Sequence, residues 1–277
     1  MVKRLSVLAS LIAACAVAGS ALAAAPEPWR LGFQAAASPV MERISEFHNL
    51  LLVIITGITV FVLGLMVYVA LRFNEKSNPV PSKTTHNTVL EVLWTAVPVV
   101  ILMAIAVPSF KLLYFMDRAQ NAEMTIKVIG HQWYWSYEYP DHGNFTFDSI
   151  MVPDDELKDG QPRLLAVDNM VVLPVGTDIR LLMTSDDVLH AWAVPAFGIK
   201  LDTVPGRINE TWVRIDREGT YYGQCSELCG VNHGFMPVAV EAVSKEAFQA
   251  WVKTARKEFA RADTEATQMA ETGTAAR

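Results

Sequence analysis

The sequence of 277 residues has few charged residues and few cysteines. Charged residues make up 19% of the chain, against ~25% in soluble domains, whereas hydrophobic residues reach 52%. This composition excludes a disordered or collagen-like chain, and the net charge of −6 excludes a nucleic-acid binder with a basic surface. Three cysteines are too few for a disulfide scaffold. No C-x-x-C-H motif occurs, so a c-type haem attachment site is also excluded.

The negative charge is concentrated in one part of the chain. Residues 1–121 carry 9 Lys and Arg against 6 Asp and Glu, whereas residues 122–245 carry 9 against 18. Residues 246–277 carry 5 of each kind. A mildly basic, apolar first part is therefore joined to an acidic part. An acidic domain attracts basic partners through long-range electrostatics.

The N-terminus has the pattern of a secretory signal. Residues 1–25 contain a basic start, an apolar stretch and a small-residue end, which predicts a signal peptide cleaved after Ala23 or Ala25. A lipoprotein signal cut before Cys15 is an alternative, because the residues before it resemble a lipobox. An uncleaved extra transmembrane helix fits the basic start and small-residue end less well.

Two long runs without charged residues follow, inside an N-terminal segment that spans residues 26–118. The runs predict membrane-spanning helices at about residues 49–71 and 92–112. The link over residues 72–90 is weakly positive, which favours a cytoplasmic location. Together with the signal, this predicts a two-helix protein of a bacterial inner membrane. Both termini and everything after residue 117 would lie on the periplasmic side.

Residues 119–245 have the pattern of an all-β domain. Short strand-like runs alternate with turn signals, which favours a β-sandwich or barrel. The runs are residues 124–130, 164–167, 171–175, 178–183, 210–215, 219–222 and 237–243. Residues 246–277 form a C-terminal segment: the pattern predicts a helix over residues 245–261, and the last dozen residues, small and polar, are expected to be flexible.

A group of sulfur and nitrogen donors follows one of these strands. Cys225, Cys229, His233 and Met236 fall within 12 residues, and His190 stands upstream. Thiolate, thioether and imidazole ligands together select copper over Mg²⁺ or Ca²⁺. Two thiolates can bridge two copper ions, with one imidazole on each, and such a pair suits fast electron transfer. A Cys225–Cys229 disulfide and a tetrahedral zinc site are the alternatives, but neither uses Met236.

Three segments closely resemble subunit II of haem–copper cytochrome c oxidases of bacterial type, namely residues 130–139, 186–195 and 222–237. The resemblance covers about residues 40–255. It implies a cupredoxin-like Greek-key β-barrel that carries a dinuclear copper centre, CuA. The implied copper ligands are His190, Cys225, the main-chain carbonyl of Glu227, Cys229, His233 and Met236. The Glu227 carboxylate also resembles the one that binds Mg²⁺ at the contact with subunit I.

The resemblance implies further roles that composition and spacing do not. Trp133 matches the tryptophan at which electrons enter, although an aromatic core position is the alternative. Glu91 matches a carboxylate at the cytoplasmic mouth of a proton path, although a Glu is also favourable at a helix N-terminus. Five acids resemble the docking face for cytochrome c, although each could simply be solvated: Glu138, Asp141, Asp168, Asp186 and Asp187.

The function implied is that of the electron-entry subunit of a proton-pumping oxidase. Electrons from cytochrome c would pass through CuA to haem in subunit I, where O2 is reduced to water. The expected partners are therefore subunit I, other oxidase subunits, cytochrome c and membrane lipid, with no nucleic acid. Quinol oxidases lack the copper ligands that this chain has. The runner-up is a membrane-anchored copper-delivery protein with a C-x3-C site, but there the distant histidine follows the cysteines, whereas His190 precedes them.

Overall fold

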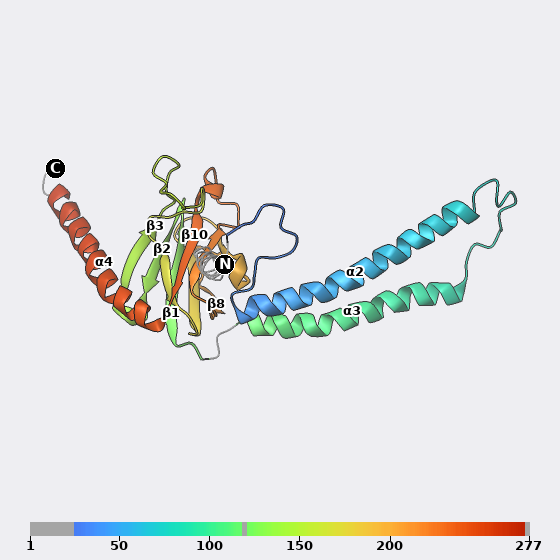
Figure 1. The fold of residues 1–277 in the computed structure, drawn as a ribbon, viewed down its shortest axis with the longest axis horizontal. Coiled ribbons are helices and arrows are strands. Elements are labelled where there is room, and N and C mark those ends of the chain that lie inside the picture. Colours follow the sequence, from blue (N-terminus) through green and yellow to red (C-terminus); the bar gives the residue numbers. More distant parts are fainter. Residues whose placement is uncertain (1–24, 118–120, 275–277) are drawn as a thin grey trace, which may run out of the picture. The chain divides into compact units, whose positions relative to one another are not determined.

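The computed structural model describes residues 25–117 and 121–274, with side chains described up to residue 259 (Figure 1). The predicted signal peptide and the alternative at Cys15 lie outside the described residues, apart from Ala25 at its edge. The chain divides into two compact units. One is the helical segment Glu42–Met116, and the other combines the residues up to Met41 with those from Asp117 onward.

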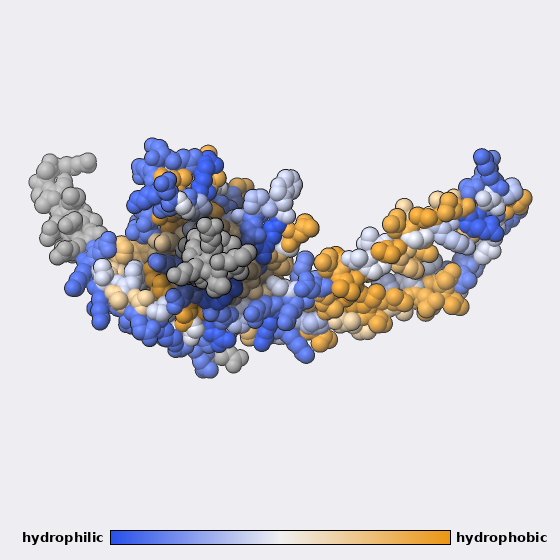
Figure 2. Space-filling view, in the orientation of Figure 1, coloured by the Kyte–Doolittle hydropathy of each residue, from blue (hydrophilic) through white to orange (hydrophobic). Residues whose placement is uncertain are grey.

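The helical unit consists of α2 (Pro39–Arg72) and α3 (Thr88–Asp117), apart from the few end residues of each helix that belong to the other unit. Both helices are long and apolar enough to cross a membrane, and each contains one of the predicted spans. Their apolar side chains are exposed along much of their length, as the hydrophobic colour in Figure 2 shows. Asn87 caps the start of α3, since its side-chain oxygen accepts main-chain N–H groups of the first turn at 3.1 and 3.2 Å.

The second unit is built from ten strands in three sheets. The strands are β1 (Met124–His131), β2 (Tyr134–Tyr139), β3 (Phe145–Ser149), β4 (Val171–Pro174), β5 (Ile179–Ser185), β6 (His190–Val194), β7 (Ile199–Thr203), β8 (Asn209–Val213), β9 (Gly219–Gln224) and β10 (Pro237–Val243). Their orders are β3-β2-β1-β5-β8, β4-β10-β9 and β6-β7. The β1–β5 and β4–β10 pairs are parallel, and the other pairs are antiparallel. The predicted all-β domain is therefore confirmed.

One of the predicted strands is wrong. Residues 164–167 form a turn in which the main-chain N–H groups of Leu165 and Ala166 both donate to the Pro162 carbonyl. Leu164 has φ of +65°, which is incompatible with a strand, and Val167 makes only an isolated bridge. Conversely, β2, β3, β6 and β7 were not among the predicted runs. Strand β6 is buried at every position and so lacks the alternation that marks a half-exposed strand.

The C-terminal helix α4 (Lys245–Thr274) is longer than predicted. Of the last dozen residues, which the sequence predicts to be flexible, those up to Thr274 are helical in the structure. Phe248 of α4 is 2% exposed and stacks near Tyr139, with ring centroids 6.5 Å apart. Phe259 stacks on Phe147 at 4.7 Å. These contacts hold α4 against the β-domain.

The segment that precedes α2 also belongs to the β-domain. Ala37 and Ser38 are buried there, with 1% and 0% exposure. The Ala37 N–H donates to the Ala196 carbonyl at 2.9 Å, and the Ser38 hydroxyl donates to the Phe197 carbonyl at 2.7 Å. These residues before α2, which were predicted to belong with the two membrane-spanning helices, therefore complete the core of the β-domain.

Candidate metal centre

The donor groups meet because three strand ends lie together. Strand β9 ends at Gln224 and β10 begins at Pro237, and these two residues pair across the ladder. The twelve residues between them form a loop closed at its base, where the Cys225 N–H donates to the Met236 carbonyl at 3.2 Å. Strand β6 begins at His190, and the Ser226 N–H donates to the carbonyl of the next residue of that strand. The loop is thereby fixed beside His190.

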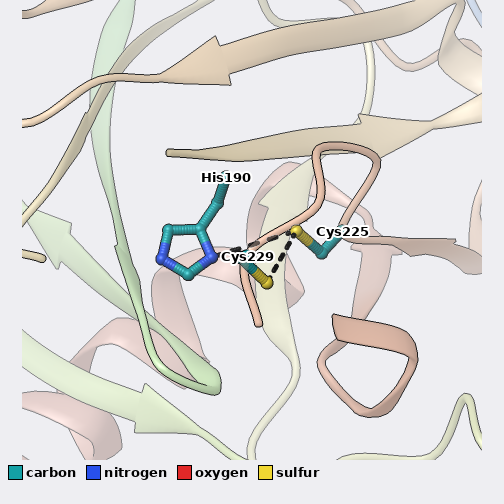
Figure 3. Close-up of side chains that lie close together, drawn as sticks. All are labelled: His190, Cys225 and Cys229. Carbon is teal, nitrogen blue, oxygen red and sulfur yellow. Dashed lines mark hydrogen bonds between the residues drawn. The ribbon is translucent and has the colours of Figure 1, made fainter. Parts of the chain in front are cut away.

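Three buried side chains form the centre of the site (Figure 3). The Cys225 and Cys229 sulfurs are 3.8 Å apart, and His190 Nδ1 lies 3.9 Å from Cys225 Sγ. The side chains of all three residues are nearly inaccessible, with 0 to 6% exposure. The sulfurs are unbonded in the structure, since a disulfide joins its atoms at ~2.05 Å. Buried polar groups facing one another in this way fit a metal ion.

The other predicted ligands lie around the same sulfurs. His233 Nδ1 is 3.5 Å and Met236 Sδ is 3.6 Å from Cys229 Sγ. The Glu227 carbonyl is 3.3 Å from Cys225 Sγ. The six predicted donors therefore converge, with one imidazole beside each sulfur. Six donors exceed the four of a tetrahedral zinc site, and the mixture of thiolate, imidazole and thioether fits copper.

The two thiols differ in acidity. Burial would raise the pKa of Cys225, but its hydrogen-bond contacts with His190 and with main-chain groups outweigh it and lower the pKa to about 7. Burial and the charge on Cys225 raise the pKa of Cys229 to about 12. Cys225 is therefore the first of the two thiols to lose its proton in the metal-free protein. Metal binding to both sulfurs must release a proton.

Asp187 and a glycine set the position of His190. Asp187 Oδ1 lies 2.8 Å from His190 Nε2, on the side of the ring opposite the sulfurs. Burial works against the charged forms of both side chains, but their hydrogen bonds raise the pKa of His190 and lower that of Asp187. Gly130 of β1 passes so close that a Cβ there would lie 2.8 Å from His190 Cδ2. The ring therefore occupies a tightly bounded space.

The turn between β1 and β2 contacts the ligand loop directly. The indole N–H of Trp133 donates to the Cys229 carbonyl at 3.2 Å, and the side-chain amide of Gln132 donates to the same carbonyl at 2.9 Å. Gly230 has φ of +121°, and a Cβ at this position would lie 3.0 Å from the Trp133 ring. The structure thus brings Trp133 against a predicted ligand. Gln132 was not among the predicted site residues, because its only signal in the sequence is that it directly precedes Trp133.

Four of the five predicted docking acids are engaged within the domain: Asp187 beside His190, and Glu138, Asp141 and Asp168 elsewhere. Glu138 lies 3.1 Å from Lys127 Nζ across the β1–β2 ladder, and its side chain is 20% exposed. Asp141 and Asp168 each accept a main-chain N–H at 2.7 Å. These bonds give the three carboxylates structural roles, whatever they contribute to the surface charge.

The two adjacent acids near the metal centre differ from each other. The Asp186 side chain is 67% exposed, and its carboxylate is 3.9 Å from His131 Nδ1. The Asp187 side chain is 31% exposed and is bonded to His190. Apolar side chains are also exposed on the ligand loop, with Leu228 at 76% and Val231 at 83%. The loop therefore presents an apolar surface beside acidic groups.

Among the described residues, neither the Glu227 nor the Glu91 carboxylate is hydrogen-bonded to the predicted copper ligands. The Glu227 carboxylate is half-buried on the ligand loop, with no hydrogen bond or ion pair among the described residues. Glu91 lies in the first turn of α3, in the helical unit, and its main-chain carbonyl accepts the Thr95 hydroxyl at 2.9 Å.

A β-domain that gathers thiolate, imidazole and thioether donors in its interior, in a chain with two long apolar helices, defines a membrane-anchored metalloprotein of the cupredoxin-like class. Family models agree: residues 124–243 match the periplasmic domain of cytochrome c oxidase subunit II, and residues 26–112 match its transmembrane domain. The chain belongs to the cytochrome c oxidase subunit II family. It is thus a subunit of an oxidoreductase complex.

Two sequence relatives agree with this assignment. The chain is 54% identical over 235 residues to "Probable cytochrome c oxidase subunit 2" of Rickettsia bellii, covering 85% of this chain and 87% of that one. It is 53% identical over 238 residues to cytochrome c oxidase subunit 2 of Oenothera berteroana, covering 84% and 92%. A solved periplasmic domain of subunit II from Bradyrhizobium japonicum shares 54% identity and covers 51% of this chain and 99% of that one, with a TM-score of 0.48.

Proposed function

We propose that this chain is the electron-entry subunit of the oxidase, which accepts electrons from cytochrome c at a dinuclear copper centre and passes them to haem in subunit I. The observation that carries the proposal is the pair of sulfurs 3.8 Å apart, each with an imidazole nitrogen within 3.9 Å. Copper bound by these donors supplies the one-electron chemistry. Reduction of O2 and proton pumping belong to the assembled complex, with O2 chemistry in subunit I.

The contribution of the protein's own residues is to bind the copper and to hold the ligands in fixed positions. The residues that would hold the copper are the two cysteines and two histidines of the cluster together with a thioether and a carbonyl, namely Cys225, Cys229, His190, His233, Met236 and the Glu227 main-chain oxygen. The ligands come from strand ends and from a loop closed by main-chain hydrogen bonds, so they move little. Rigid ligands keep the reorganisation on electron transfer small. Burial of the sulfurs also keeps water away from the site.

Electrons enter at Trp133. Its indole N–H is bonded to the carbonyl of Cys229, which gives a short covalent and hydrogen-bonded path to a ligand sulfur. The exposed apolar side chains of the ligand loop supply a contact surface for the donor protein. Electron entry and partner contact therefore involve the same end of the β-domain.

The docking surface is acidic. Burial and the nearby charges of Asp148, Asp186 and Asp187 raise the pKa of Tyr134, which indicates that these carboxylates gather beside the β1–β2 turn. Acidic groups around an apolar contact steer a basic partner such as cytochrome c and make its association sensitive to salt. Asp186, the more exposed of the two adjacent acids, is the strongest docking candidate. Glu138, Asp141 and Asp168 add to the negative electrostatic potential of the domain.

The remaining assignments follow from the family. The Glu227 carboxylate, free of other bonds, contributes to a Mg²⁺ site at the contact with subunit I. Glu91 at the start of α3 lies at the cytoplasmic entrance of a proton path. The helices α2 and α3 span the bacterial inner membrane, and both termini and the copper domain face the periplasm.

Copper loading of the full chain in detergent tests this function. We expect two copper ions per chain and an EPR signal with the multi-line hyperfine pattern of one electron shared by two coppers. Cys225→Ser and Cys229→Ser should each abolish the signal, and Ser226→Ala, in the same loop, should retain it. A copper-delivery protein would bind a single copper without that pattern. A mixed-valence signal that persists in either cysteine variant would show that the ligand assignment is wrong.

A further inference from the structure

We infer that Asp187 is a positioning residue, which orients His190 and ties the β1–β2 turn to the ligand loop, and that this is a different task from docking a partner. The inference rests on the proposed copper centre for its functional meaning. Its structural content, however, can be tested in the metal-free protein. It separates Asp187 from its neighbour Asp186, with which the sequence had grouped it.

The carboxylate of Asp187 joins two distant segments. Its Oδ1 accepts from His190 Nε2 at 2.8 Å, and its Oδ2 accepts the Gln132 main-chain N–H at 2.6 Å. Ser185 also donates to Oδ1, at 3.2 Å. A carboxylate with bonds to both oxygens has a fixed orientation, so it transmits that orientation to each partner.

The first bond decides which nitrogen of His190 faces the sulfurs. A neutral imidazole has one N–H and one bare nitrogen. With Nε2–H donated to Asp187, the bare nitrogen is Nδ1, which lies 3.9 Å from Cys225 Sγ. Metal-binding histidines commonly donate their other ring N–H to a carboxylate, which fixes tautomer and ring angle. Because the His190 side chain is fully buried behind Asp187, its Nε2 is bonded to this carboxylate and not to solvent.

The second bond reaches the opposite side of the site. Gln132, held through its main-chain N–H, donates its side-chain amide to the Cys229 carbonyl, and Trp133 donates its indole N–H to the same oxygen. Asp187 is therefore linked to His190 directly and to Cys229 through one residue. These hydrogen bonds link His190, at the start of β6, to Cys229, in the loop between β9 and β10.

Asp186 provides a matched control. It carries the same charge one residue away, but its side chain is 67% exposed and its nearest described ion-pair partner is His131, at 3.9 Å. Asp186→Asn and Asp187→Asn remove one negative charge each from nearly the same place. A pure docking role predicts similar effects for both variants, whereas a positioning role predicts that only Asp187 affects the metal site.

The experiment compares Asp187→Ala, Asp187→Asn and Asp186→Asn in the full chain in detergent. In the metal-free protein, at a pH high enough to leave the His190 imidazole neutral, histidine-selective ¹⁵N NMR should show His190 as the Nε2–H tautomer in the wild type and in Asp186→Asn. In Asp187→Ala it should show mixed tautomers. Asp187→Asn keeps one acceptor oxygen, so it tests the same bond with less risk to folding and should give an intermediate result.

Copper binding supplies the second measurement. Loss of an outer hydrogen bond to a ligand typically costs about 10–100-fold in metal affinity, so we expect a loss of that size, with altered EPR hyperfine splitting, for Asp187→Ala. Asp186→Asn should retain wild-type copper affinity and instead raise the KM of the assembled oxidase for cytochrome c. Unchanged His190 resonances and unchanged copper affinity in both Asp187 variants would overturn the inference. Failure of the wild type to show a mixed-valence signal would overturn the proposed function, and the NMR comparison would still decide the role of Asp187.

Discussion

Gly130→Ala is the sharpest test of how closely the β-domain bounds its ligands. The added methyl would lie 2.8 Å from His190 Cδ2 and 3.0 Å from Thr203 Oγ1. Non-bonded carbon atoms settle at ~3.5–4.0 Å, so the ring must move by about 0.7 Å or more. The ring has no solvent to move into, because His190 is fully buried.

The displacement is large compared with what a metal site tolerates. Ligand distances in such sites are fixed to within about 0.2 Å. We therefore expect Gly130→Ala to lower the copper affinity at least about 10-fold, as does damage to the outer support of a ligand. Gly234→Ala is the matched control, since Gly234 lies inside the ligand loop and a Cβ there has nothing within 4 Å.

The assay is a copper titration of the full chain in detergent against a competing chelator, with EPR of the loaded protein. Circular dichroism and thermal unfolding establish that both variants are folded. Gly234→Ala should match the wild type in affinity and hyperfine splitting. Wild-type affinity and an unchanged spectrum for Gly130→Ala would refute the argument, because they would show that His190 binds metal equally well from a displaced position.

Three further predictions concern separate parts of the β-domain. Trp133→Phe, which removes the hydrogen bond to Cys229, should slow electron entry from cytochrome c in stopped-flow measurements on the assembled oxidase while KM stays nearly constant; a wild-type rate would refute the entry role. Phe248→Ala should lower the free energy of unfolding by about 3–5 kcal/mol in urea titrations without changing the copper EPR signal, because Phe248 is 2% exposed; an unchanged free energy would show that α4 does not stabilise the domain. Burial raises the pKa of Tyr139 well above 10.0, so above pH 10 the unfolded chain loses this proton while the folded protein keeps it. Stability should thus fall with rising pH, by about 1.4 kcal/mol at pH 11 for this group, and Tyr139→Phe should remove that part of the slope in unfolding measured at several pH values.

The structure brings the predicted ligands close together, and most of them are neighbours in the sequence. Cys225, Cys229, His233 and Met236 lie in one loop, and any loop closed by a β-hairpin must gather them. His190 lies 35 residues before Cys225, and it was included for the chemistry of its imidazole and not for its spacing. Only the fold shows that β6 starts beside that loop.

The support of the site could not be predicted in the same way. Asp187 stands next to Asp186 in the sequence, and the two differ only in which segment approaches them. The bond from Gln132 to Asp187 spans 55 residues, and it exists because β1 and β5 run parallel in register. No periodicity or spacing reports such a contact.

Strands were missed for a related physical reason. Sequence patterns detect strands that have one exposed and one buried face, whereas β6 is buried at every position. The apolar run at residues 164–167 was assigned as a strand, although the carbonyl of Pro162 draws it into a turn. In both cases tertiary surroundings decided the local structure.

The two adjacent acids also change how a kinetic effect should be interpreted. A variant of Asp187 removes a charge near the docking surface and, through His190 and Gln132, disturbs both ends of the copper site. An altered rate in that variant therefore mixes weaker association with a changed electron acceptor. Asp186 contributes charge without bonding to a ligand. Only the difference between the two isosteric variants isolates the effect of the metal site, because the change in long-range charge is common to both and cancels.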